Sequence, residues 1–104
     1  MAAHFIYICE EVIDREKLAE YFREVVTTVE GFGIKYDAVY TPFVQLEGEP
    51  VRGVVLARFE STERALAWYN SEAYTTIRQL RLDGARGAVL VVENGAVAPE
   101  LRLI

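Results

Sequence analysis

The chain has few of the residues from which disulfide frameworks, metal centres and membrane anchors are built. Its 104 residues include one cysteine, Cys9, and one histidine, His4. A single thiol makes no internal disulfide, and one thiol with one imidazole does not complete a metal site within a chain. No apolar run approaches the roughly 18 residues of a membrane span, and the N-terminus lacks the basic flank of a signal peptide. We therefore expect a cytoplasmic protein that requires no metal, haem or other cofactor and no membrane.

Positive charge is also scarce. The chain carries 11 Lys and Arg against 16 Asp and Glu, a net charge of -5, whereas binding to a phosphate backbone needs a basic face. Arg52, Gly53 and Phe59 do match three positions of the third-strand signature of RNA-binding domains. However, Val54 and Leu56 stand where that signature requires aromatic side chains that stack on bases. The sequence therefore argues against a nucleic-acid partner.

Apolar residues are abundant, at 52% of the chain, and their spacing alternates between strand-like and helix-like segments. Strands are predicted over 4–12, 35–44, 53–59 and 88–93, with Pro42 making the far end of the second an edge or a bend. Helices are predicted over 15–28 and in a second region of two pieces, one from Ser61 to Tyr69 and one that follows a cap or kink at Asn70-Ser71 and ends near Gly84, with Asp14 and Ser61 as N-caps. This βαββαβ order predicts an α+β, ferredoxin-like domain over residues 1–95: a four-stranded antiparallel sheet with the helices on one face. Residues 96–104 form a C-terminal tail too short for a core of its own.

The third and fourth predicted strands are apolar at both odd and even positions, so both faces of the sheet are apolar there. The residues are Val54, Val55, Leu56 and Ala57 in one strand and Val89, Leu90, Val91 and Val92 in the other. A monomer would expose an apolar patch of several hundred Å², which is more than monomers normally tolerate. We therefore expect two sheets to pack face to face in a homodimer.

The densest polar and aromatic group lies in the second helical region. Its members are Trp68, Tyr69, Ser71, Tyr74, Arg78 and Arg81. At about 100° per residue, Arg81 shares a helical stripe with Tyr74 and Ile77 and points toward the apolar side. A guanidinium there needs a partner, which is either a carboxylate such as Glu47 or an anionic ligand. We favour the Glu47 ion pair for the free protein and retain Glu47 and the six residues of this group as candidate ligand contacts.

Tyr7, Tyr74 and His4 are the candidates for handling a proton. Phenols in a cleft between sheet and helices can orient or protonate a small substrate, although buried tyrosines with satisfied hydroxyls are equally typical of a core. A lone histidine near a chain end is more typical of a solvated side chain. Glu10 and Glu11 adjoin on a strand, so we expect their side chains on opposite faces and no carboxylate dyad.

The segment from Trp68 to Tyr74, followed by Ile77 and Arg81, resembles the signature of a bacterial domain-of-unknown-function family, family thirteen-thirty, in the dimeric α+β barrel superfamily. The resemblance covers nearly the whole chain, with Ile34 standing where the family usually has a second glycine. It implies a ferredoxin-like homodimer and no particular reaction. Other members of the superfamily include cofactor-free monooxygenases, haem-degrading enzymes, lactone isomerases and polyketide cyclases, and membership does not choose among them.

Two functions follow as hypotheses. In the first, the homodimer binds a small aromatic or anionic organic molecule between sheet and helices, and could act as a cofactor-independent enzyme of the isomerase, cyclase or monooxygenase type. In the second, it is a non-catalytic dimeric binding or structural module. An Arg81 free of any carboxylate favours the first hypothesis, and a closed pair with Glu47 favours the second.

Overall fold

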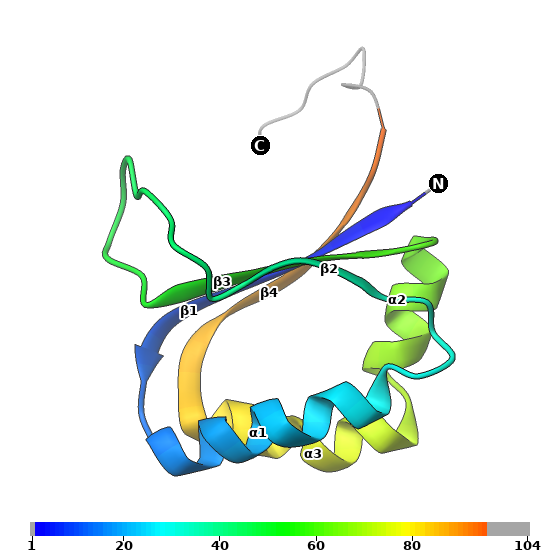
Figure 1. Cartoon of the computed structure of the whole chain (residues 1–104), viewed down its shortest axis with the longest axis horizontal. Helices are drawn as coiled ribbons and strands as arrows, with labels where there is room; N and C mark the ends of the chain where they lie inside the picture. The colour runs from blue at the N-terminus through cyan, green and yellow to red at the C-terminus, as the bar shows by residue number, and fades with distance from the viewer. Residues whose placement is uncertain (1, 96–104) are drawn as a thin grey trace, which may run out of the picture.

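The computed structural model describes residues 2–95, so the predicted tail at 96–104 lies outside the described residues. In chain order the elements are β1 (Ala3–Val12), α1 (Arg15–Thr28), β2 (Lys35–Val39), β3 (Gly53–Phe59), α2 (Thr62–Tyr69), α3 (Glu72–Gly84) and β4 (Ala85–Glu93). The strands form one antiparallel sheet in the order β2-β3-β1-β4. Figure 1 shows the sheet edge-on, with α1 and α3 side by side beneath it and α2 at one end. The predicted ferredoxin-like α+β fold is confirmed.

The helix starts follow the predicted caps. The Asp14 carboxylate accepts hydrogen bonds from the backbone N–H groups of Glu16 and Lys17, and the Ser61 hydroxyl accepts from that of Arg64. These bonds satisfy amide groups that have no partner within the first turn of a helix. No helix within residues 2–95 has both the length and the apolar character needed to cross a membrane.

Two strand boundaries differ from the prediction. β2 ends at Val39 rather than at residue 44, because Tyr40 adopts a left-handed backbone conformation with φ 54° that breaks the extended chain. β4 begins at Ala85 rather than at residue 88, directly after α3, and Ala85 pairs with Val12 at the end of β1. Because β2 ends at Val39, the loop between β2 and β3 is longer than predicted.

The pairing of β1 with β4 is interrupted by a bulge between Cys9 and Glu11. The Arg86 guanidinium contacts both carboxylates here, with Nη1 2.7 Å from Glu10 Oε1 and Nε 3.3 Å from Glu11 Oε1. The expected separation of the two carboxylates on opposite faces is therefore wrong, since a regular strand was assumed where the register shifts. All three side chains are largely exposed, so these ion pairs contribute little stability.

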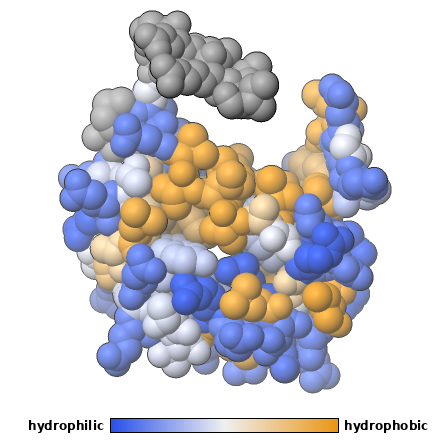
Figure 2. Space-filling view, turned by 180° about the vertical axis from the view of Figure 1, so that it is seen from behind, coloured by the Kyte–Doolittle hydropathy of each residue, from blue (hydrophilic) through white to orange (hydrophobic). Residues whose placement is uncertain are grey.

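The two faces of the sheet differ in what covers them. The face toward the helices forms the core, together with Leu18 and Tyr21 of α1, Trp68 of α2 and Tyr74 of α3. The opposite face, including Val54, Leu56, Leu90 and Val92, is not covered within residues 2–95, and Leu90 keeps 45% of its surface exposed. Figure 2 shows apolar side chains gathered over the upper part of the molecule, above the blue surface of the helices. The sheet is thus apolar on both faces, as predicted.

Candidate functional site

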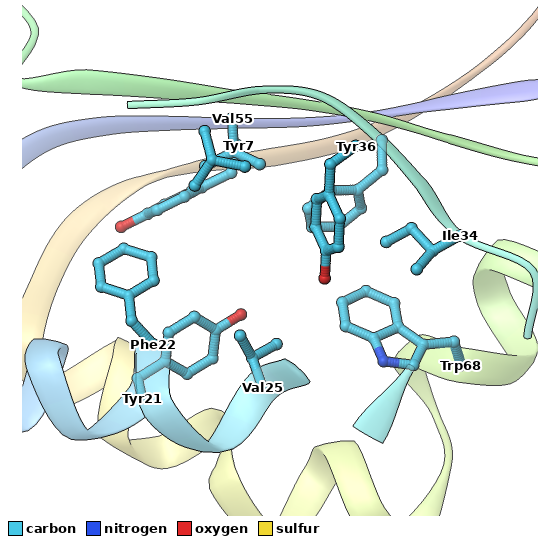
Figure 3. A pocket seen from close by; sticks show the side chains of 10 residues that line it. Tyr7, Tyr21, Phe22, Val25, Ile34, Tyr36, Val55 and Trp68 are labelled. Carbon is cyan, nitrogen blue, oxygen red and sulfur yellow. The ribbon is translucent and has the colours of Figure 1, made fainter. Parts of the chain in front are cut away.

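A cavity of about 50 Å³ lies between the helix-facing side of the sheet and the helices (Figure 3). Its lining residues are Phe5, Tyr7, Tyr21, Phe22, Val25, Ile34, Tyr36, Val39, Val55 and Trp68. They come from β1, β2, β3, α1, α2 and the turn before β2. None of these side chains is a carboxylate or an imidazole. The interior is therefore apolar, but it is smaller than a cavity of roughly 150 Å³ that holds a benzene ring.

A wider hollow of about 470 Å³ adjoins this cavity and is lined by Phe22, Val25, Val26, Tyr36, Val39 and Tyr40. Four of these residues line the inner cavity as well. The hollow is therefore the entrance to the cavity, and it opens between α1 and the edge strand β2. Its volume falls within the range of small-molecule sites, about 300–1,000 Å³.

One side of the cavity is backed by a closed polar network. The hydroxyl oxygens of Tyr21 and Tyr74 are 2.9 Å apart, and Arg81 Nε donates to the Tyr74 hydroxyl at 3.3 Å. Beside them, Trp68 Nε1 donates to Thr28 Oγ1 at 2.9 Å. These bonds join α1, α2 and α3, so the cavity wall is fixed by three helices.

Arg81 is 5% exposed and lies on α3 behind the cavity wall, with its guanidinium carbon 5.4 Å from the centre of the Tyr7 ring. Burial lowers the pKa of this guanidinium, but the Tyr74 and Tyr21 hydroxyls raise it more, so the net direction is upward and Arg81 stays charged. None of the ion pairs formed within residues 2–95 includes Arg81. The buried cation is stabilised by aromatic rings and a phenol oxygen rather than by a carboxylate.

The favoured pairing of Arg81 with Glu47 is therefore not formed. Glu47 is exposed in the loop between β2 and β3. The Gln45 side-chain amide donates to the backbone carbonyls of Glu47, Gly48 and Glu49, so the loop closes on itself. The helical periodicity correctly predicted that Arg81 lies on the buried face of α3. It does not constrain the position of a carboxylate in a loop, such as that of Glu47.

Two further hydroxyls, those of Tyr7 and Tyr40, are buried without a hydrogen-bond partner within residues 2–95. The pKa of Tyr7 is raised to about 12 by burial and by the neighbouring Cys9 thiol, while Tyr40 and Arg81 lower it. Burial and the same thiol also raise the pKa of Tyr40. Both phenols thus keep their protons at neutral pH, and their hydroxyl oxygens are buried away from the hollows that the two residues line.

The remaining predicted site residues have structural contacts or lie elsewhere. The Ser71 hydroxyl caps α3 by accepting from the Tyr74 N–H at 3.2 Å, and it donates to the Trp68 carbonyl. Tyr69 packs against Tyr74, and the Arg78 guanidinium lies 4.7 Å from the centre of the Tyr69 ring. His4 is on β1 with the opposite parity to Tyr7, and thus on the other sheet face. The structure brings Tyr7, Trp68, Tyr74 and Arg81 together, with Tyr7 and Trp68 lining the cavity and Tyr74 and Arg81 behind its wall. His4 and Glu47 lie elsewhere.

Sequence reasoning missed the part of the site that α1 and the turn after β2 supply. Tyr21, Phe22 and Val25 fall within the predicted helix 15–28 and Tyr40 within the predicted strand 35–44, where none of them belongs to a site motif. Val26 gave a signal, since this apolar residue lies beside the core stripe and helps to line the entrance. Residues 2–95 bring together no group of three or more His, Cys, Asp or Glu side chains that could hold a metal ion.

Comparison with known proteins agrees with the resemblance seen in the segment 68–81. A model of the family described as "Domain of unknown function (DUF1330)" matches residues 2–95. No curated protein matches the chain in sequence.

Several solved structures share the fold. A protein of unknown function from Rhodopseudomonas palustris superposes with a TM-score of 0.73 at 16% identity, covering 91% of this chain and 83% of that one. An EthD family protein from Bacillus halodurans gives a TM-score of 0.59 at 13% identity, covering 91% and 100%. A Nitrosomonas europaea protein that bears the name of an antibiotic biosynthesis monooxygenase gives 0.59 at 18% identity, covering 94% and 100%. At these identities the likeness shows the fold alone.

Proposed function

The chain belongs to the DUF1330 family of unknown function, and from that premise we propose that it binds a small, ring-bearing organic molecule between its sheet and its helices, in the hollow of about 470 Å³ that adjoins the inner cavity. The single observation that supports this most is a buried, charged Arg81 beside the cavity with no carboxylate partner within residues 2–95. A purely structural arginine at this depth is normally closed by a carboxylate. Arg81 is not one of the residues that line the cavity, so its unneutralised charge favours a ligand with a polar or anionic group through its electric field there rather than by contact.

The cavity chemistry favours hydrogen-bond donation over proton abstraction. A general base needs a side chain that is unprotonated near neutral pH, and the ten lining residues contain no carboxylate or imidazole. The buried phenols are protonated, because burial raises the pKa of Tyr7 to about 12 and also raises that of Tyr21. The site is thus suited to holding and polarising a ligand. For any isomerase, cyclase or monooxygenase reaction, the ligand itself would have to be reactive, because the cavity supplies no general base.

The alternative, a binding or structural module without catalysis, is supported by a specific observation. Tyr21, Tyr74, Trp68 and Ser71 are already hydrogen-bonded to protein atoms, so their polar groups have structural partners. Turnover of a bound carbonyl compound would exclude this alternative, whereas binding without turnover would support it.

Binding can be read from the single tryptophan, since Trp68 lines the cavity. We expect benzoate to change the Trp68 emission saturably and to raise the melting temperature with ligand concentration. Val25→Phe, which fills the junction of cavity and entrance, should abolish both effects. The matched control Leu82→Phe, on the exposed side of α3, should leave them intact. Absence of any saturable change in the wild-type protein would refute the proposal.

We also propose that two copies pack through the exposed apolar sheet face. This is supported by the exposure of Leu56 (38%) and Leu90 (45%) on adjoining parts of that face. Light scattering should give about twice the 11.8 kDa of one chain. Leu56→Asp or Leu90→Asp should give monomers, and Leu82→Asp on α3 should not. A wild-type mass of one chain at micromolar concentration would contradict the dimer.

A further inference from the structure

The inner cavity and the adjoining hollow are continuous but differ greatly in size. The cavity has a volume of about 50 Å³ and the hollow one of about 470 Å³, and both are lined by Phe22, Val25, Tyr36 and Val39. A group of the size of a water molecule needs about 10–15 Å³ of such volume, so the cavity has room for roughly three to five of them. A ring therefore stays in the hollow, and only a short substituent on that ring enters the cavity.

The cavity offers apolar contacts to such a substituent. Ile34 and Trp68 line the cavity but not the hollow, and they lie together at one end of it (Figure 3). Val55 also lines the cavity alone. Protein interiors are close-packed and rarely contain spaces larger than a water molecule. Spaces with apolar walls take up apolar guests, because carbon groups inside them gain dispersion contacts on every side.

Three lining residues are tyrosines, but their hydroxyls leave little polar surface in the cavity. The Tyr21 hydroxyl is bonded to that of Tyr74, and the Tyr7 oxygen is buried away from the cavity. Figure 3 shows the Tyr36 hydroxyl directed into the space between sheet and helices. Tyr36 lines the hollow as well and is 44% exposed, so its hydroxyl can bond to water there. A charged substituent in the cavity would lose its water and contact no charged lining residue.

We propose that the ligand is an aromatic ring with a short alkyl substituent of about three carbon atoms, and that the ring occupies the hollow while the substituent enters the inner cavity. The polar group of the ligand is on the opposite side of the ring, at the mouth of the hollow. The cavity then sets the length of substituent that fits, and Ile34 and Trp68 determine where it ends. This assignment rests on the proposed binding function and narrows it to a class of ligand.

The test measures dissociation constants by ligand-observed NMR for a series that runs from benzoate to 4-hexylbenzoate. One buried methylene group changes a dissociation constant about fourfold. We expect the constant to fall about fourfold per carbon up to 4-propylbenzoate and to rise again by 4-pentylbenzoate, because further carbons overlap the cavity wall. A constant that stays within about twofold across the series, or one that falls steadily to 4-hexylbenzoate, would overturn the inference.

Variants of the lining should move this optimum. Ile34→Ala removes side-chain carbons at the end of the cavity, so the optimum should move to substituents longer by roughly two carbons. Ile34 is only partly buried, and Val55→Ala provides a second enlargement should Ile34→Ala fail to fold. The matched control Val26→Ala, which lines only the hollow, should leave the optimum in place. An unmoved optimum in a folded Ile34→Ala or Val55→Ala variant would overturn the assignment.

The orientation of the ligand can be read by NMR. The chain has one tryptophan, so nuclear Overhauser effects to an indole are assigned without ambiguity. The terminal methyl group of 4-propylbenzoate should give such effects to Trp68, and the ring protons should give them to Val26. The reverse pattern would place the ring inward and would overturn the proposal.

The chemistry of the substituent is tested with 4-(methoxymethyl)benzoate, which has the length of 4-propylbenzoate but carries an oxygen in place of one methylene group. We expect it to bind about threefold or more weakly than 4-propylbenzoate, because the oxygen loses its water on entering the cavity. Tyr36→Phe should leave the optimum of the alkyl series unchanged. Tighter binding of the methoxymethyl compound that is lost in Tyr36→Phe would show that Tyr36 bonds a ligand oxygen, and would overturn the alkyl assignment.

The outcomes separate the two proposals. If benzoate and all of its alkyl derivatives fail to bind, the binding function itself is wrong. If benzoate binds but the alkyl series has no optimum, the hollow binds aromatic molecules and the assignment of the inner cavity to an alkyl substituent is wrong.

Discussion

Two pairs of buried tyrosines lie around the cavity, which Tyr7 and Tyr21 line, and the pairs differ in their hydrogen bonds. The Tyr21 and Tyr74 hydroxyls are bonded to each other at 2.9 Å, and Arg81 donates to the second of them. The Tyr7 and Tyr40 hydroxyls are buried as well, but neither is bonded within residues 2–95. Burial alone therefore does not decide whether a phenol in this cavity has a structural role.

The difference follows from the elements that carry each pair. Tyr21 and Tyr74 are on α1 and α3, two adjacent helices whose packing brings the side chains together directly. Tyr40 is at the end of an edge strand, in a strained backbone conformation next to the entrance. The helical pair thus closes its hydrogen bonds within the scaffold, whereas the sheet pair is buried where the backbone is strained beside the entrance.

Among the predicted changes in stability, the largest is expected from truncation of Trp68, which packs against the helical pair of tyrosines. This ring is 2% exposed, packs against Phe5, Phe59 and Tyr74, and donates to Thr28. Trp68→Ala should lower the free energy of unfolding by about 3–5 kcal/mol, as measured by urea unfolding followed by circular dichroism. The control Leu66→Ala, a half-exposed position of α2, should cost less than about 1 kcal/mol. If Trp68→Ala lowers the free energy of unfolding by less than about 1.5 kcal/mol, the packing around the helical pair is not a rigid scaffold and its contrast with the sheet pair is lost.

High pH should destabilise the protein through tyrosines of both pairs. Burial raises the pKa of Tyr21 and Tyr40 above the ordinary value of 10.0, and it raises the pKa of Tyr7 to about 12. Between these values the unfolded chain loses protons that the folded chain keeps, so stability falls as pH rises.

The stabilising contribution of each buried phenol is complete below about pH 10 and is lost as pH rises toward its folded-state pKa. The slope should be up to about 1.4 kcal/mol per pH unit for each such tyrosine. Urea unfolding at intervals from pH 9 to pH 11.5 measures it. Tyr21→Phe should make the slope shallower by up to about 1.4 kcal/mol per pH unit, the contribution of one buried tyrosine. A stability that is constant over this range would contradict the burial of these side chains.

Elements with a strong local signal were predictable. The helix predicted over 15–28 is observed at those bounds as α1, and Asp14 and Ser61 cap their helices as expected. Leu18, Tyr21 and Val25 of α1, at three- and four-residue spacing, pack in or against the core. The failures lie where long-range geometry overrides local pattern. Residues 40–44 were predicted as strand because their composition is β-branched and aromatic. The strand ends before them, at Val39, because the left-handed backbone of Tyr40 turns the chain away.

The candidate site was predictable only in part, for a similar reason. Helical periodicity places Arg81 among buried aromatic residues, because neighbours on a helical face are set by spacing alone. The pairing of Tyr7 with Tyr40 depends on a turn conformation and on the absence of a side chain at Gly53. Neither feature appears in the sequence as a motif. The partner of Arg81 could not be predicted either, because no periodic spacing relates a loop residue such as Glu47 to a helix.

Removal of single hydroxyls should sharpen the contrast between the pairs. Tyr21→Phe and Tyr74→Phe should each lower the free energy of unfolding by about 1 kcal/mol, because each breaks the buried 2.9 Å bond and leaves one group unsatisfied. Tyr7→Phe and Tyr40→Phe should leave it unchanged or raise it slightly. The measurement is urea unfolding at neutral pH. Equal losses for all four variants would mean that the sheet pair is bonded in solution and that the contrast does not hold.

The smallest effect is expected where charge is removed. Arg81→Met eliminates a buried cation that has no carboxylate within residues 2–95, so relief of its desolvation offsets the lost contacts to Tyr74 and Tyr7. We expect the free energy of unfolding to change by less than about 1 kcal/mol. Glu47→Gln, in an exposed loop, should have no measurable effect, and the double variant should be additive within about 0.3–0.5 kcal/mol. Coupling near 3 kcal/mol would instead reveal a buried Arg81–Glu47 pair in solution. The site would then be closed on the scaffold side by a carboxylate, and the argument for a ligand at Arg81 would be lost.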